Sequence, residues 1–212
     1  MPRMTMGFYA KHVFPRVMDW MLRGPQHQAE RETVLRSIRG DVLEVGFGTG
    51  LNLRHYPPGV TRLTAIDVAT MLPLRVARRI AAAPFPVTRT ELSGERLPFP
   101  DAQFDCVVTT LTLCSIQDPV PALREMRRVL KPDGTYVFLE HGRSDDARVA
   151  RRQDFFNPLQ RRLACGCNIN RRIDALVREA GLEIRSLERY VLEGAPRMMA
   201  EMYRGAAGRG EG

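Results

Sequence analysis

Residues 42–50 read VLEVGFGTG, and this stretch decides the fold. An apolar run that contains a single acid, Glu44, gives way to glycines at Gly46, Gly48 and Gly50. Apolar residues bounded by glycines are typical of a short buried strand that ends in a turn. Glycine tolerates positive φ and has no Cβ, so a ligand can lie directly on the backbone of such a turn. The stretch therefore predicts a strand, a tight turn (the glycine turn, residues 46–50) and a ligand site beside it.

Strand-like and helix-like segments alternate along the rest of the chain. We expect seven strands, at 41–46, 61–67, 86–92, 104–113, 135–141, 182–193 and 198–206. Helices are expected between them, at 49–56, 70–83, 119–130 and 170–180, and a turn at 132–134. This order predicts an α/β fold whose mostly parallel sheet has helices on both faces. The last two strands follow each other too closely for a crossover helix, so an antiparallel hairpin is expected at the sheet edge.

This pattern divides the chain into two parts. Residues 1–40 are expected to form an N-terminal helical lid, and residues 41–212 the main domain, with a helical insertion at about 145–168. The first helix carries seven large apolar side chains: Met4, Met6, Phe8, Phe14, Met18, Trp20 and Met21. We expect them to pack over the active site, and a membrane-surface helix is the alternative. The glycine-rich tail at 205–212 is expected to fray.

The composition limits the class of protein. With 212 residues, 44% of them hydrophobic, the chain suits one globular domain, and no run approaches the roughly 18 apolar residues of a membrane span. No signal peptide is recognised and four scattered cysteines fit no disulfide framework, so a cytoplasmic monomer or homodimer is expected. The net charge of +8 fits an acidic partner or an arginine-rich solvated surface. Aromatics do not alternate with the arginines, so nucleic acid is not the expected partner.

The nature of the ligand follows from two acids. Asp67 ends the second expected strand, where a carboxylate can accept hydrogen bonds from a ribose diol. The glycines follow G-x-G-x-G rather than the dinucleotide pattern, and Glu44 would repel a pyrophosphate but favour an ammonium or a sulfonium. Both cations occur in S-adenosylmethionine, which is the expected cofactor. The alternative for Glu44 is a structural cap of the turn's N–H groups.

Several segments resemble one enzyme family. LEVGFGTG, AID, ERLPFPDAQFDCVV and LREMRRVLKPDGTYVFLEH are similar to the motifs of class I S-adenosylmethionine-dependent methyltransferases of the type 11 family. GLNLRHYPP, TLTLCS, LEH, CGCNINR and FYAKHVFPRVMDW resemble its branch of thiol S-methyltransferases and their bacterial relatives. The resemblance implies a Rossmann-like fold and methyl transfer to a small molecule, best interpreted as a thiol. The alternatives are N-, O- or C-methylation of a lipid, quinone or natural-product scaffold, and a non-catalytic cofactor-binding regulator.

The resemblance also implies which residues contact the cofactor. They are Tyr9, Glu44, Gly46, Gly48, Gly50, Asn52, Asp67, Val68, Met71, Ser93, Gly94, Glu95 and Leu111. Ser93 departs from the family, because many members have an acid there that binds the adenine amino group. Either Ser93 takes the place of that acid, or the backbone of Gly94 and Glu95 holds the adenine. The Glu95 side chain is expected to form a cap or a surface contact rather than to bind the adenine.

The chemistry needs a positioned nucleophile and, at most, a modest base. A thiol with a pKa of about 8.5 is easily deprotonated, and His141, at the end of the fifth strand, is the candidate base. Its alternative is local shaping of the pocket. Cys114 is expected to line the pocket rather than to accept the methyl group, and Asn168 and Arg171 to contact the substrate. The C-x-C at 165–167 lacks companions at zinc-like spacing, so no metal is expected.

Overall fold

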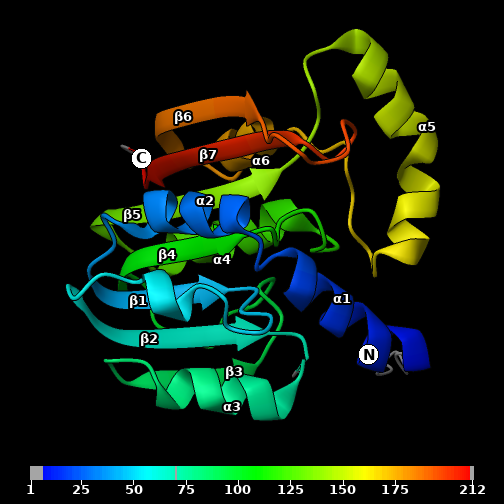
Figure 1. Cartoon of the computed structure of the whole chain (residues 1–212). Coiled ribbons are helices and arrows are strands. Elements are labelled where there is room, and N and C mark those ends of the chain that lie inside the picture. The colour runs from blue at the N-terminus through cyan, green and yellow to red at the C-terminus, as the bar shows by residue number, and fades with distance from the viewer. Residues whose placement is uncertain (1–6, 70, 211–212) are drawn as a thin grey trace.

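The computed structural model describes residues 7–69 and 71–210, which form a seven-stranded sheet covered by helices (Figure 1). The strands lie in the order β3-β2-β1-β4-β5-β7-β6. Their bounds are Gly40–Val45 (β1), Val60–Asp67 (β2), Val87–Glu91 (β3), Phe104–Thr110 (β4), Leu130–His141 (β5), Glu183–Val191 (β6) and Glu201–Gly208 (β7). β1 to β5 pair in parallel, and β7 pairs antiparallel with both β5 and β6. The predicted α/β class and final hairpin are confirmed.

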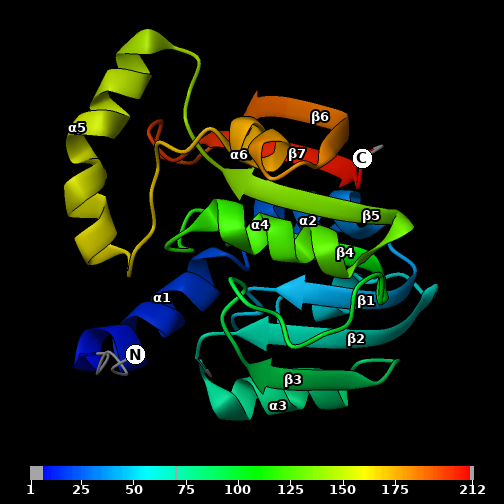
Figure 2. The same ribbon diagram turned by 180° about the vertical axis from the view of Figure 1, so that it is seen from behind.

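Helices cover both faces of this sheet. They are η1 (Tyr9–Val13, π), α1 (Phe14–Met21), α2 (Pro25–Leu35), η2 (Leu53–His55, 3₁₀), α3 (Pro73–Ala81), α4 (Pro119–Val129), α5 (Ala147–Leu163) and α6 (Ile173–Glu179). α4 and α6 share one core with the sheet, and α2 and α3 share the other, as the two opposite views show (Figures 1 and 2). α1 and α5 lie instead at the edge toward which the parallel strands point.

The central strands are buried on both faces, which explains their continuous apolar sequence. In β4, Val107 belongs to the core on the α4 side and Val108 to the core on the α2 side, and both are fully buried. In β1, Leu43 belongs to the core on the α4 side and Val42 to the core on the α2 side. Parallel strands that bury both faces lose the alternation of polar and apolar residues. The strands could therefore be located from the sequence without a period-two pattern.

Four local predictions need correction. The helix expected at 49–56 is a single 3₁₀ turn, since the glycine turn extends to Gly50 and Pro57-Pro58 follow at once. The helix expected at 70–83 begins at Pro73, because Leu72 has a positive φ of 48°. The turn at 132–134 lies within β5 as a bulge, where the pairing shifts from Phe104–Leu130 to Cys106–Thr135.

The fourth correction concerns the glycine-rich tail. Residues 205–208 belong to β7, which lies between β5 and β6. A Cβ on Gly205 would lie 2.5 Å from the Ser186 carbonyl oxygen and 2.6 Å from the Phe138 ring. The small residues that suggest fraying thus let β7 pack closely. Residues 211–212, like Met4 and Met6 of the expected lid, lie outside the described residues. Among the helices that are described, none combines the length and apolarity needed to cross a membrane.

Candidate active site

The three glycines of the glycine turn have positive φ for different physical reasons. Their φ angles are 82°, 56° and 77° for Gly46, Gly48 and Gly50. A Cβ on Gly46 would lie 2.1 Å from the Thr112 hydroxyl oxygen, and a Cβ on Gly50 would lie 3.0 Å from the Phe47 ring. At Gly48, no described atom comes within 4 Å of the Cβ position. Two glycines are therefore required by packing, whereas Gly48 leaves open space in which a ligand can reach the backbone.

Asp67 holds this turn in place from the end of β2. Its carboxylate is buried and accepts hydrogen bonds from the N–H groups of Gly48 at 2.7 Å and Ala69 at 3.3 Å. Burial raises the pKa of Asp67, although these two N–H groups work in the opposite direction. Asp67, the residue predicted to bind a ribose, therefore lies directly beside the open glycine, at the carboxyl edge of the sheet.

Glu44 is fully buried and is bonded by side chains rather than by N–H groups of the turn. It accepts hydrogen bonds from Asn52 Nδ2 at 2.8 Å and from the Tyr56 hydroxyl at 2.9 Å. Burial raises the pKa of Glu44 to about 7 despite both bonds. Asn52 Nδ2 also donates to Thr110, while Asn52 Oδ1 is buried without a hydrogen-bond partner in the described part of the chain. An unpaired buried acceptor next to a carboxylate suits an incoming ammonium group.

Asp19 of α1 fastens the N-terminal helix to the glycine turn. Its carboxylate is 1% exposed and accepts hydrogen bonds from the Thr49 hydroxyl and from Arg79, both at 2.6 Å, and from Arg75. Arg79 also donates to the Thr49 carbonyl at 2.7 Å. Burial acts to raise the pKa of Asp19, but these donors outweigh it and the pKa is lowered. The role of Asp19 was not predicted from the sequence, in which its signal is a single acid inside the amphipathic segment VMDW.

The apolar side chains of the expected lid are less enclosed than predicted. Phe8 and Trp20 are 76% and 72% exposed, so these two do not pack over the sheet edge. Tyr9 donates from its hydroxyl to the Leu163 carbonyl at the end of α5, at 3.1 Å. This bond joins η1 to the end of α5, at the sheet edge toward which the parallel strands point (Figure 1). The predicted contact of Tyr9 with the cofactor stays a prediction.

The remaining predicted cofactor residues differ in their surroundings. Val68 is 72% exposed just after β2, Met71 is partly buried, and Leu111 follows β4 with a positive φ of 53°. Ser93 is exposed, and its hydroxyl accepts from the Glu95 N–H at 3.3 Å. A Cβ on Gly94 would lie 3.0 Å from a Val45 methyl group, which fixes this loop against β1.

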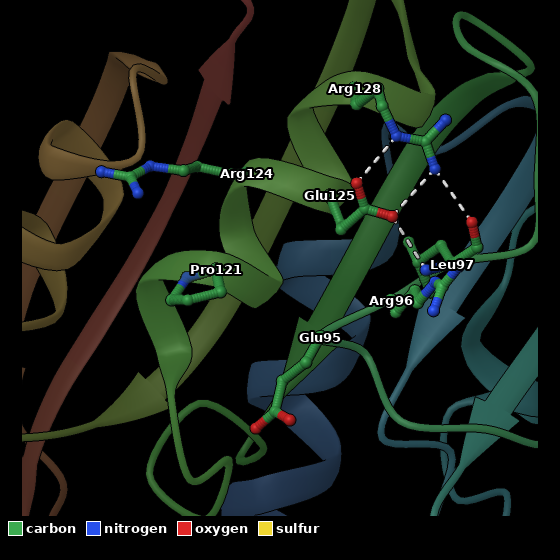
Figure 3. A pocket seen from close by; sticks show the side chains of 7 residues that line it. All are labelled: Glu95, Arg96, Leu97, Pro121, Arg124, Glu125 and Arg128. Carbon is green, nitrogen blue, oxygen red and sulfur yellow. Dashed lines mark hydrogen bonds and ion pairs between the residues drawn. The ribbon is translucent and has the colours of Figure 1, made fainter.

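The Glu95 carboxylate accepts from the Asp118 N–H at 3.2 Å, just before α4. From the sequence, a cap or surface contact was expected for this side chain. Glu95 also rims a surface hollow of about 480 Å³, lined in addition by Arg96, Leu97, Pro121, Arg124, Glu125 and Arg128 (Figure 3). Arg128 is fixed there by Glu125 at 2.8 Å. Since no strand end lines this hollow, it is a recess beside α4 and not the cofactor site.

A second centre lies at the ends of β4 and β5. Cys114, His141 and Cys167 are all buried, and their sulfur and ring nitrogen atoms lie within 4.8 Å of one another (the thiol–imidazole cluster). His141 Nε2 is 3.2 Å from Cys167 Sγ. A hydrogen bond with Cys167 lowers the pKa of Cys114 despite burial, and the neighbouring Cys114 raises the pKa of His141 although burial opposes it. The sequence pointed to His141 and Cys114 separately but not to Cys167 as their neighbour.

Asn168 and Arg171 fasten the segment after α5 to the turn that carries Cys114. Asn168 donates from its backbone and from Nδ2 to the Cys114 carbonyl, at 2.8 and 2.9 Å. Arg171 donates to the carbonyls of Leu113 and Ile116, the latter at 2.7 Å. These bonds position the thiol–imidazole cluster. The predicted contacts of Asn168 and Arg171 with a substrate stay predictions.

Residues 43–138, which carry the glycine turn, Asp67 and most of β5, match a family described as "Methyltransferase domain". This part of the chain is therefore similar to methyltransferase domains. Thiol S-methyltransferase TMT1A of Homo sapiens is 35% identical over 144 residues, 61% of this chain and 54% of that protein. The ubiquinone/menaquinone biosynthesis C-methyltransferase UbiE of Saccharophagus degradans is 37% identical over 150 residues, 66% of this chain and 60% of that protein. The chain spans about half the length of the curated thiol methyltransferases that it matches.

The comparison of folds agrees with this similarity. The 1,6-didemethyltoxoflavin-N1-methyltransferase of Burkholderia thailandensis, solved with 1,6-didemethyltoxoflavin and S-adenosylhomocysteine, matches with a TM-score of 0.70 and 15% identity, over 93% of this chain and 84% of that one. At such identity the likeness concerns the fold alone. Together with the strand order it confirms the Rossmann-like methyltransferase fold predicted from the sequence.

Proposed function

We propose that this protein is an S-adenosylmethionine-dependent methyltransferase whose acceptor is the sulfur of a small-molecule thiol. The observation that carries the proposal is the open Gly48 position beside Asp67, at the same sheet edge as the buried thiol–imidazole cluster. The similarity to thiol S-methyltransferases supports the choice of a thiol. A cytoplasmic location, expected from the sequence, is part of the proposal.

The residues at the glycine turn suit S-adenosylmethionine, which supplies a methyl group on a sulfonium. We expect Asp67 to accept from the ribose hydroxyls, which is supported by its position beside Gly48, whose Cβ side is open. Asn52 Oδ1, a buried acceptor without a described partner, and the neighbouring Glu44 suit the ammonium of the amino-acid end. Methyl transfer is an in-line displacement, and positioning of the reactants can lower such a barrier by about 7–11 kcal/mol. The chain's main contribution is thus to hold the two ligands and exclude water.

His141 is the group through which the acceptor's proton can leave. It is buried at the end of β5, and an imidazole there needs to take a proton only from a thiol of pKa about 8.5. C-methylation of a quinone is the second candidate, since UbiE is 37% identical over two thirds of this chain. A quinol carbon would need activation by a stronger base than a thiol does.

The test measures methyl transfer from labelled S-adenosylmethionine to an alkyl thiol, hydrogen sulfide, a catechol, a quinol and phosphatidylethanolamine. We expect turnover on the thiols alone. Asp67→Asn should weaken cofactor binding about 10- to 100-fold, because a neutral amide accepts more weakly from the ribose. Asp133→Asn, at an exposed carboxylate on β5, is the matched control. Turnover on the quinol but on no thiol would replace the proposal with C-methylation, and cofactor binding without any turnover would favour the regulator.

A further inference from the structure

The thiol–imidazole cluster has the donor set of a zinc site. We propose that Cys114, His141 and Cys167 bind one Zn²⁺ through two thiolates and an imidazole, and that its fourth coordination position takes the acceptor's sulfur. The second half rests on the proposed function, whereas the metal site itself does not. The combination of two sulfurs and one imidazole selects zinc over the oxygen-seeking cations Mg²⁺ and Ca²⁺.

The spacing of the ligand atoms is close to what zinc requires. With Zn–S of about 2.3 Å and Zn–N of about 2.0–2.1 Å, a tetrahedral site separates neighbouring ligand atoms by about 3.4–3.8 Å. In the cluster all three atoms lie within 4.8 Å of one another, and His141 Nε2 is 3.2 Å from Cys167 Sγ. Shifts of side-chain rotamers alone can therefore complete the geometry.

The backbone holds these ligands by an elaborate set of contacts. Cys165 and Gly166 both have positive φ, 48° and 97°, so the chain reverses sharply and turns Cys167 inward while Cys165 stays exposed. Left-handed backbone at a non-glycine residue costs about 1–2 kcal/mol. A Cβ on Gly142 would lie 2.5 Å from the Arg171 carbonyl oxygen, which shows how closely the end of β5 lies against this segment. Such strain is expected where a turn must place a functional side chain.

His141 supplies an independent observation. Its side chain is 92% buried, since its exposed fraction is 8%, and Nδ1 has no hydrogen-bond partner among the described residues. A catalytic base is usually oriented by a third group that bonds its other ring nitrogen. Here the polar neighbour that the structure gives the ring is a cysteine sulfur on the Nε2 side. A ring directed at sulfur atoms fits a metal ligand better than a base alone.

Three protein ligands distinguish this site from a structural one. Structural zinc sites use four protein ligands, and catalytic sites use three and leave one position open. No fourth His, Cys, Asp or Glu joins the group in the described residues. Glu140, the adjacent acid, is engaged with the Thr112 N–H at 2.9 Å. Thr112, two residues before Cys114, in turn packs against Gly46, so the segment that carries Cys114 contacts the glycine turn.

The open position gives the cluster a role in methyl transfer. With zinc bound, His141 is a ligand and no longer the base. An acceptor thiol that binds zinc then loses its proton to solvent and becomes a thiolate, as coordinated thiols do. Its lone pair then forms a new carbon–sulfur bond to the methyl group, while the bond between that methyl and the cofactor's sulfonium breaks. The products are a neutral thioether, which binds zinc weakly, and S-adenosylhomocysteine. No oxidant or reductant is consumed.

The metal site is tested on the whole protein by binding. Protein freed of metal with a chelator is reloaded with ZnCl₂ or CoCl₂, desalted and analysed for metal content and for sulfur-to-cobalt charge-transfer absorption. We expect about one metal per chain in the wild type, and at least a tenfold loss of affinity in Cys114→Ser and Cys167→Ser. Cys165→Ser removes the exposed cysteine of the same turn and should bind as the wild type does. Circular dichroism checks that each variant is folded. A wild type that binds no metal, or equal binding by folded Cys114→Ser, would overturn the site.

A second measurement separates the metal's role from the proposed function. Metal-free and reloaded enzyme are compared for thiol methylation and for binding of S-adenosylhomocysteine. We expect thiol methylation to fall at least about tenfold without zinc and to return on reloading, with binding of S-adenosylhomocysteine unchanged. Full thiol methylation by the metal-free enzyme would overturn the role but leave the proposed function intact. Zinc binding without methylation of any thiol would support the site and reject the thiol assignment.

Discussion

Asp19 and Thr49 are joined by a hydrogen bond of 2.6 Å that ties the N-terminal helix to the glycine turn. The same carboxylate is held by Arg79 from α3, which also donates to the Thr49 carbonyl. Three segments that are far apart in the sequence therefore meet at one buried acid. We infer that α1 helps to fix the backbone of the glycine turn.

Asp19→Asn should loosen this junction without changing its volume. An amide accepts more weakly from Arg75, Arg79 and Thr49 than a carboxylate does, so we expect a loss of about 1–3 kcal/mol in the free energy of unfolding. Affinity for S-adenosylhomocysteine should fall as well, because the glycine turn loses part of its support. Thermal unfolding and calorimetric titration measure the two effects, with Asp133→Asn as the surface control.

The pH dependence of the Asp19 contribution has a defined sign. Its pKa in the folded protein is lowered, so its stabilisation is fully present above the ordinary aspartate pKa of about 3.9 and is lost as the pH falls through the lower folded value. The stability difference between wild type and Asp19→Asn should therefore shrink below about pH 4. A difference that persists unchanged in acid would show that the charge of Asp19 is not what holds α1.

Gly48→Ala and Gly46→Ala should distinguish a glycine that leaves room for the cofactor from one that is needed for packing. A methyl group at Gly48 meets no described atom within 4 Å, so only the positive φ penalises it, by about 1–2 kcal/mol. At Gly46 the methyl group would lie 2.1 Å from Thr112, which adds an overpacking penalty of about 1–3 kcal/mol. We expect Gly48→Ala to be the more stable variant in urea and yet to bind S-adenosylhomocysteine at least about tenfold more weakly than the wild type. Normal binding by Gly48→Ala would mean that the cofactor does not reach this backbone.

The sequence is most informative where a residue's role depends on its own segment. The strands of the central sheet were recognised because burial on both faces leaves unbroken apolar runs such as Val107-Val108. Asp67 and the glycine turn were placed correctly, since both follow strands whose carboxyl ends share one edge. These features depend on local pattern and on the topology that the alternation implies.

Roles that depend on distant partners were not predictable in the same way. Apart from Cys165, Cys167 had no companion ligand at zinc-like spacing in the sequence. The structure brings it to Cys114 and His141, which are 53 and 26 positions away. Glu44 was expected to act on the turn itself, but the direction of its side chain within β1 brings it to Asn52 and Tyr56. In each case the contact is fixed by tertiary packing, and the spacing along the chain carries no trace of it.

Gly205→Ala tests whether the tail is an integral strand. The added methyl group would lie 2.5 Å from the Ser186 carbonyl oxygen and 2.6 Å from the Phe138 ring, and neither the backbone nor the buried ring can move freely. We expect a loss of about 1–3 kcal/mol in the free energy of unfolding, measured in urea. Gly210→Ala, beyond the end of β7, is the control for replacing a glycine. Its added methyl group meets no atom closer than 3.5 Å, so this variant should lose less stability than Gly205→Ala. Equal stability of Gly205→Ala and wild type would instead support the frayed tail that its composition suggests.

Glu44→Gln should change how stability depends on pH. Burial raises the folded pKa of Glu44 to about 7, so the protonated acid is favoured in the folded state and its ionisation destabilises the fold. The wild type should therefore lose about 3 kcal/mol between about pH 4.5, the ordinary glutamate value, and pH 7.

Glu44→Gln, which carries no charge, should lack this decline and be the more stable protein at pH 8. Its amide group can donate to the Tyr56 hydroxyl oxygen and accept from Asn52, so the two contacts need not be lost. Urea unfolding at pH 5, 6, 7 and 8 compares the two proteins. The gain in stability should be accompanied by weaker binding of both S-adenosylmethionine and S-adenosylhomocysteine, because both carry the ammonium group that Glu44 is proposed to face. Parallel pH profiles for the two proteins would exclude Glu44 as the titrating group.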